Sequence, residues 1–285
     1  MPSRSSGLRT AALTACALIG FAANSLLCRM ALGPAAIDAA TFTLLRLSAG
    51  AVTLLLLARA AKRKTAAGGG ESWASAVTLF AYAGAFSFAY LRLSAGSGAL
   101  ILFASVQATM ISWGLFEGES VRRAEWIGLA IAFGGLVALT FPGLSAPDAE
   151  GAAMMSLAGV AWGIYSLLGR RVGDPLAATA SNFARSLPLA LGASLATLLH
   201  AHISARGALL AIASGSLASG VGYTLWYAAL PSLPATRAAI VQLAVPVIAA
   251  AGGVLLLGES ITPRLLGAGA LVLGGVAAAV LRPGR

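Results

Sequence analysis

Apolar residues dominate this chain in long runs, and polar residues gather in the short segments between them. A helix of roughly 20 apolar residues is long enough to cross a hydrocarbon core of about 30 Å. The pattern predicts an all-α membrane protein with ten transmembrane helices. The expected spans are 8–27, 39–58, 74–93, 97–115, 122–140, 151–168, 176–199, 207–229, 234–257 and 262–281.

The second half of the sequence repeats the first. A Gly-Glu-Ser triplet at 118–120 and a Gly-Gly pair at 134–135 recur at 258–260 and 274–275, both shifted by 140 positions. Each copy has five spans, and because five is odd the second copy enters the membrane from the opposite side. This arrangement is typical of transporters. We therefore expect residues 1–145 and 146–285 to form two inverted five-helix repeats of one transport unit. Matches at shifts of 139–141 pair Ser25, Leu27, Arg29, Pro34 and Arg46 with Ser166, Leu168, Arg170, Pro175 and Arg185.

The composition agrees with a membrane protein. Hydrophobic residues make up 59% of the chain and charged residues 10%, against roughly 45–50% and about 25% in soluble domains. Arg4 and Arg9 before an apolar run would also suit a secretory signal peptide. That run is longer than a typical signal core and is needed as the first member of the repeat, so we interpret it as a span.

Basic residues lie mostly on one side of the expected membrane. Ten spans put both termini on the same side, and that side carries 13 Lys and Arg against 4 on the other. By the positive-inside rule, both termini face the cytoplasm of a bacterial inner membrane. The net charge of +10 is spread over short linkers rather than gathered on one domain face, so we expect no nucleic-acid partner. The expected partners are membrane lipid and a small-molecule substrate, and we expect a monomer.

Acidic groups are missing from the interior of the expected spans. Each Asp and Glu lies in a loop or near a span end, and His200 and His202 lie at the end of span seven. Proton-driven carriers commonly use a buried acid or histidine, so the sequence favours a uniporter or facilitator. Cys16 and Cys28 have no metal-ligand spacing, and we expect no cofactor and no metal.

Amides and aromatic rings near the middle of the spans are the candidate substrate-binding groups. A buried amide must find a partner, so the amides either face a wet cavity or bond a neighbouring helix, and the two interpretations stay open. Tyr82, Phe86 and Tyr90 recur every four residues and should share one face of span three, as core or as part of a pocket. The candidates are Asn24, Tyr82, Tyr90, Gln107, Trp162, Tyr165 and Gln242.

Two charges and two prolines interrupt the apolar spans. Arg46 and Arg185 each need backbone carbonyls, water or a ligand anion, and their symmetric placement favours a structural anchor over contact with a substrate carboxylate. Pro188 and Pro246 interrupt spans seven and nine but have no counterpart in spans two and four. We expect these prolines to bend gating helices, because an interior proline frees a backbone carbonyl.

The residues quoted above resemble the EamA-type branch of the drug/metabolite transporter superfamily, and the resemblance covers nearly the whole chain. It is carried by two five-span repeats, an Arg in spans two and seven, and a Gly-Glu pair closing spans four and nine. Residues 82–102 and Val106-Gln107 in span four are similar to the aromatic amino acid exporters of bacteria. The resemblance implies a central cavity between the repeats and export of amino acids, aromatic and other apolar ones included.

The expected function is therefore an amino-acid exporter that works by alternating access and is not an enzyme. A carrier for nucleotide sugars or phosphorylated metabolites is the alternative, but it would need several basic side chains at the cavity. Gly96-Ser97-Gly98 imitates the nucleophile loop of an intramembrane serine protease. A serine nucleophile needs an adjacent base, and no histidine lies at membrane depth.

Overall fold

The computed structural model describes residues 4–63, 73–116, 123–140, 146–169, 172–229, 241–242 and 244–281. These residues are almost entirely helical, and the β contact recorded among them is an isolated antiparallel bridge between Ile37 and Ile203. The elements are α1 (Arg4–Leu32), α2 (Ala39–Ala60), α3 (Trp73–Ala89), α4 (Ala95–Phe116), α5 (Arg123–Thr140), α6 (Ala149–Gly169), α7 (Pro175–Ala196), η1 (Leu198–His200), α8 (Ala205–Ala213), the π-helix η2 (Ser214–Val221), α9 (Gly222–Ala229), α11 (Ala244–Leu257) and α12 (Pro263–Leu281).

The predicted class, an all-α membrane protein, agrees with these helices. Within the described residues, four helical segments are long and apolar enough to cross a membrane. Large apolar side chains such as Ile19, Val52 and Leu157 are exposed on outward faces, as contact with lipid requires. Each expected span overlaps described helical residues, but the count of ten crossings stays a prediction. The four segments are Leu8–Leu32, Ala39–Ala60, Ala149–Gly169 and Ala205–Trp226.

An aspartate caps the N-terminus of the second helix in each half. Asp38 Oδ1 accepts a hydrogen bond from Thr41 N at 2.9 Å and so caps α2. Asp174 Oδ1 accepts one from Ala177 N at 3.2 Å and caps α7, with a proline in the first turn. An N-cap oxygen satisfies one of the free N–H groups of the first turn. The second helix of each half thus begins in the same way.

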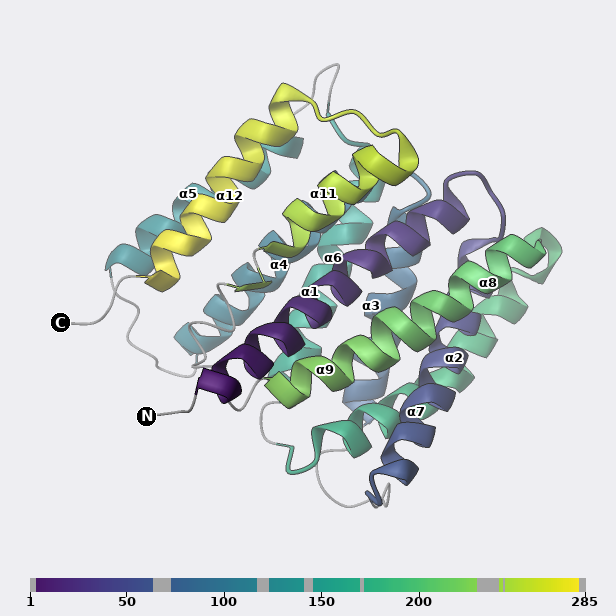
Figure 1. The fold of residues 1–285 in the computed structure, drawn as a ribbon. Coiled ribbons are helices and arrows are strands. Elements are labelled where there is room, and N and C mark those ends of the chain that lie inside the picture. The colour runs from purple at the N-terminus through teal and green to yellow at the C-terminus, as the bar shows by residue number, and fades with distance from the viewer. Residues whose placement is uncertain are drawn as a thin grey trace.

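The helices pack as two halves with exchanged partners (Figure 1). Three helices of the first half pack directly on their expected counterparts: α2 on α7, α4 on α11 and α5 on α12. Other contacts occur once in each direction between the halves. The packing of α3 on α6 corresponds to that of η2 and α9 on α1. The packing of α4 on α6 corresponds to that of α11 on α1. The first turn of α1 and the last turn of α12 lie at the same end of the molecule (Figure 1).

Candidate functional site

A small central cavity lies where the two halves meet. Its volume is about 20 Å³, which is room for about one water molecule and far below the roughly 300–1,000 Å³ of pockets that hold small molecules. The structure therefore has this site closed. The lining residues are Phe21, Asn24 and Ser25 of α1, Tyr82 and Phe86 of α3, Leu102 and Phe103 of α4, Trp162 of α6, Tyr223 of α9, and Gln242.

Aromatic rings from the two halves form the walls of the central cavity. Tyr82 packs on Trp162 with ring centroids 4.8 Å apart, and Tyr223 packs on Phe21 at 5.7 Å. A shift of 141 positions relates Phe21 to Trp162 and Tyr82 to Tyr223, so the two contacts are counterparts. Trp162 and Tyr223 also meet, at 5.3 Å. Matched pairs of this kind are what a two-fold axis through the cavity would produce.

Asn24 joins the polar groups of the cavity wall. Its Oδ1 accepts a hydrogen bond from Ser214 Oγ of η2 at 2.5 Å, and its Nδ2 donates to the Tyr82 hydroxyl at 3.4 Å. The same hydroxyl oxygen accepts a hydrogen bond from Arg46 Nη2 at 3.1 Å. One chain of contacts therefore runs from η2 through α1 and α3 to α2.

Arg46 is buried behind the aromatic wall, with 1% of its surface exposed. Its guanidinium carbon lies 4.9 Å from the ring centroid of Phe86 and 5.3 Å from that of Tyr82. Among the described residues, its Nε and Nη1 have no hydrogen-bond partner. The recorded ion pairs of the described carboxylates involve other basic residues. Within the described part of the chain, Arg46 therefore has no recorded carboxylate partner.

The π-helix η2 brings backbone close to the buried arginine. A Cβ added to Gly215 would overlap the Arg46 carbonyl oxygen, and one added to Gly220 would meet Thr53 Cγ2 at 2.9 Å. Glycine at these positions lets η2 and α2 approach at backbone distance. Single π-helical turns are rare and often mark functional sites, and this one carries Ser214, the partner of Asn24.

The structure brings together four of the seven predicted substrate-binding residues. Asn24, Tyr82, Trp162 and Gln242 line the central cavity. Tyr165 lies directly behind it, with its ring centroid 5.5 Å from that of Trp162.

Tyr90 and Gln107 do not line the central cavity. Helix α3 ends at Ala89 rather than at the expected residue 93, and Tyr90 lies in the following turn with its hydroxyl 3.4 Å from the Ala95 carbonyl oxygen. Gln107 is buried on α4 but is not a lining residue. Tyr90 nevertheless continues the predicted aromatic face of span three, because its N–H donates to the Phe86 carbonyl at 3.2 Å and its ring centroid lies 4.8 Å from that of Phe86.

The predicted anchor and gating residues lie outside the lining of the central cavity. Arg185 is half-buried on α7. Pro188 is exposed within an α7 that continues past it. Pro246 is buried on α11, and residues 241–242 before this helix are also helical. A gating role for either proline stays a prediction.

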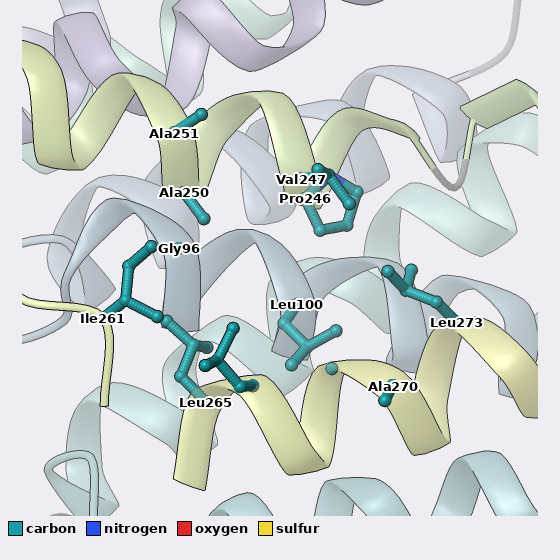
Figure 2. Close-up of a pocket in the computed structure, with 12 residues that line it drawn as sticks. Gly96, Leu100, Pro246, Val247, Ala250, Ala251, Ile261, Leu265, Ala270 and Leu273 are labelled. Carbon is teal, nitrogen blue, oxygen red and sulfur yellow. The ribbon is translucent and has the colours of Figure 1, made fainter. Parts of the chain in front are cut away.

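A larger lateral cavity lies between α4, α11 and α12 (Figure 2). Its volume is about 320 Å³ and its lining is apolar. Pro246 and Val247 face Leu100 and Leu273 across it, and Gly96 and Leu265 close its other end (Figure 2). The lateral cavity has none of the amide and hydroxyl groups of the central one.

Polar contacts tie the two halves together at one end of the bundle, which we call the Asp38 end. It consists of the connections at 33–38, 90–94, 146–148, 197–204 and 258–262. Arg29 Nε lies 3.4 Å from Glu259 Oε1, and both Glu259 oxygens accept from Ala95 N. Asp38 Oδ2 accepts from His202 N at 3.1 Å. Burial acts to raise the pKa of Asp38, but hydrogen bonds from Thr41 and His202 lower it below its ordinary value.

Arg92 provides a third tie at the Asp38 end. Its Nη2 lies 2.7 Å from Glu150 Oε2, and its Nη1 lies 3.7 Å from Asp148 Oδ2. Each of the three ties joins a residue of the first half to one of the second. At the opposite end, Arg63 Nε lies 3.7 Å from Asp174 Oδ2.

Sequence reasoning missed Phe21 and Tyr223. Both are common apolar or aromatic residues in apolar runs, so composition alone does not single them out. The repeat could have found them, because the 141-residue shift that relates Asn24 to Tyr165 also relates Phe21 to Trp162 and Tyr82 to Tyr223. Ser214 was missed because a serine in a membrane helix usually bonds its own backbone.

Comparisons with known proteins place this architecture among transporters. The model of the EamA-like transporter family matches residues 149–281. The chain is 51% identical over 280 residues to a Pseudomonas aeruginosa protein named "Uncharacterized protein PA1977", covering 97% of this chain and 95% of that protein. It is also 29% identical over 168 residues to an Archaeoglobus fulgidus "Uncharacterized transporter", covering 57% of this chain and 59% of that one.

A crystal structure described only as that of a protein has the same fold. It covers 94% of this chain and 98% of its own, with a TM-score of 0.65 and 21% sequence identity. At this identity the likeness concerns the fold alone. The matched family and the relative of nearly full length agree with the helices and cavity described above. Residues 149–281 thus match the EamA-like transporter family, and this match points to a membrane transporter of small molecules rather than an enzyme.

Proposed function

We propose that this chain exports amino acids, aromatic and other apolar ones included, across the bacterial inner membrane. The observation that carries the proposal is the central cavity, in which aromatic rings surround the amides of Asn24 and Gln242. Aromatic walls accommodate apolar side chains, and amides bind the polar end of an amino acid. The substrate-binding residues we propose are Asn24, Tyr82, Trp162 and Gln242, with Tyr165 behind them.

Transport would proceed by alternating access between two inverted five-helix repeats. The exchanged helix contacts and the counterpart pairs Tyr82–Trp162 and Tyr223–Phe21 support the repeat. The surplus of Lys and Arg on the side of the membrane that carries the termini supports a cytoplasmic location for both termini, which makes the Asp38 end the periplasmic one. Because the central cavity holds about one water molecule, an amino acid enters only after the helices around it separate.

Counterflow in proteoliposomes tests the proposal. Purified protein is reconstituted into vesicles loaded with unlabelled phenylalanine, and uptake of labelled phenylalanine is measured with and without a pH gradient. We expect uptake above that of empty vesicles, and no dependence on the gradient if the chain is a facilitator. Trp162→Ala should abolish uptake, whereas Trp73→Ala, an exposed tryptophan at the start of α3, should not. Uptake of a sugar nucleotide but not of amino acids would establish the alternative carrier.

A further inference from the structure

We infer that the central cavity selects its ligand by charge: it takes small apolar molecules that carry a carboxylate and excludes organic cations of the same size. The selecting group is Arg46, which acts through the hydroxyl of Tyr82. The inference rests on the proposed transport function, whose substrate class it narrows. It is independent of whether that substrate is an amino acid.

Arg46 has hydrogen-bonding capacity that the closed structure leaves unused. Two of its donor atoms, Nε and Nη1, are buried and have no partner in the described part of the chain. A buried donor without an acceptor costs free energy, and more so when it belongs to a charged group. A purely structural arginine would satisfy these donors with helix carbonyls. Here the one recorded acceptor is the hydroxyl of Tyr82, a residue that lines the central cavity.

The Tyr82 hydroxyl has one hydrogen-bonding group left for a ligand. Arginine can only donate hydrogen bonds, so the Tyr82 oxygen must accept from Arg46. Asn24 Nδ2 donates to the same oxygen. With both lone pairs used, what the hydroxyl still offers is its own proton. A carboxylate in the cavity is the strongest acceptor for it, because hydrogen bonds to ionised acceptors are shorter and stronger than neutral ones.

The aromatic walls alone would predict the opposite preference. Rings such as those of Tyr82 and Phe86 attract organic cations through their faces. Both rings already stack on the Arg46 guanidinium, at 5.3 and 4.9 Å. A second cation would meet the field of this arginine in a medium where charges interact far more strongly than in water. No described carboxylate lines the central cavity to offset that repulsion.

Three compounds with the same ring and different charges test the inference. They are 3-phenylpropionate, an anion; phenylalanine, a zwitterion; and 2-phenylethylamine, a cation. Binding is measured as the thermal stabilisation of the purified full-length protein over a range of ligand concentrations. We expect the wild type to bind the two carboxylates at least tenfold more tightly than the amine. Arg46→Gln should remove this difference, and Arg46→Lys should keep most of it.

A matched control comes from the same helix. Arg59 lies at the exposed end of α2, so Arg59→Gln removes one positive charge by the same substitution and should leave the preference unchanged. If Arg46→Gln does not fold, Tyr82→Phe replaces it, because it removes the hydroxyl and keeps the ring. Either variant should lower carboxylate affinity about tenfold.

The outcomes separate this inference from the proposed transport function. Equal binding of amine and carboxylate by the wild type, binding of none of the three probes, or a preference that survives in folded Arg46→Gln would each overturn the inference. Phenylalanine counterflow without Arg46-dependent selection would support amino-acid transport and refute selection by charge. Arg46-dependent binding of 3-phenylpropionate without phenylalanine counterflow would support charge selection and refute amino-acid export.

Discussion

At the scale of single residues, Asn24 joins helices of both halves through Ser214 and Tyr82. Asn24→Leu removes both contacts in a buried site. We expect the unfolding free energy to fall by about 1–3 kcal/mol, because the Ser214 hydroxyl loses its acceptor. Phenylalanine counterflow should slow by about tenfold, since a difference of about 1.4 kcal/mol corresponds to that factor. Thermal melts and initial counterflow rates of one preparation measure the two effects.

Thr78→Ala is the matched control for Asn24→Leu. Thr78 Oγ1 donates only to carbonyls of its own helix, at Ala74 and Ser75, so its loss should change neither measurement appreciably. Equal effects of the two substitutions would show that Asn24 acts as an ordinary helix residue.

Asp38 gives the fold a defined response to pH. Its pKa in the folded protein lies below the ordinary value of 3.8, because hydrogen bonds from Thr41 and His202 outweigh the opposing effect of burial. The stabilisation from its carboxylate is therefore complete above about pH 4 and is lost as the pH falls through the folded pKa. The melting temperatures of wild type and Asp38→Asn should differ by a constant amount from pH 8 to about pH 5 and converge below about pH 4. Convergence near pH 6 would contradict this assignment.

Part of the candidate site could be predicted from the sequence. Asn24 and Gln242 stand out because an amide in an apolar span needs a partner, and both line the cavity. Gln107 satisfies the same criterion but does not line it. The sequence indicates how deep a residue lies in the membrane, whereas lining depends on how the helix is rotated about its axis. That rotation is set by packing against helices distant in the sequence.

At the scale of elements, η2 packs on α2 through Gly215. A Cβ at this position would overlap the Arg46 carbonyl oxygen, and neither backbone can move without disturbing its neighbours. Gly215→Ala should therefore lower the unfolding free energy by about 1–3 kcal/mol, the usual cost of overpacking. Gly192→Ala on α7 is the control, because nothing lies within 4 Å of its added Cβ. It should be neutral or stabilising. Equal melting temperatures of the two variants would refute the close approach.

Apolar runs predicted where the helices lie but not their internal form. An expected span at 207–229 is divided in the structure into α8, η2 and α9. A π-helix adds about one residue to each turn, and a run that is apolar on all sides carries no periodicity that would reveal the change. The end of α3 was misplaced by a few residues: Tyr90, Leu91 and Leu93 follow the apolar run directly, yet the chain turns there.

At the scale of the whole molecule, the central cavity is closed while three ties join the halves at the Asp38 end. Glu259 holds together the end of α1, the start of α4 and the α11–α12 connection. If these ties keep the Asp38 end shut, Glu259→Gln should open it more often. A lost charged hydrogen bond is worth about 1.5–3 kcal/mol, so opening should increase by about tenfold or more.

Cys28 provides a native probe of that opening. It is fully buried on α1, next to Arg29, while Cys16 is exposed and can be removed by Cys16→Ser. In this background a membrane-impermeant maleimide should label Cys28 slowly, and Glu259→Gln should raise the labelling rate about tenfold. Asp174→Asn breaks the ion pair with Arg63 at the opposite end and should not raise it. Because alternating access opens one end at a time, releasing the opposite end favours the state in which Cys28 is shielded. Faster labelling in Asp174→Asn than in Glu259→Gln would show that the contacts which shield Cys28 lie at the end of Arg63 and Asp174, not at the Asp38 end.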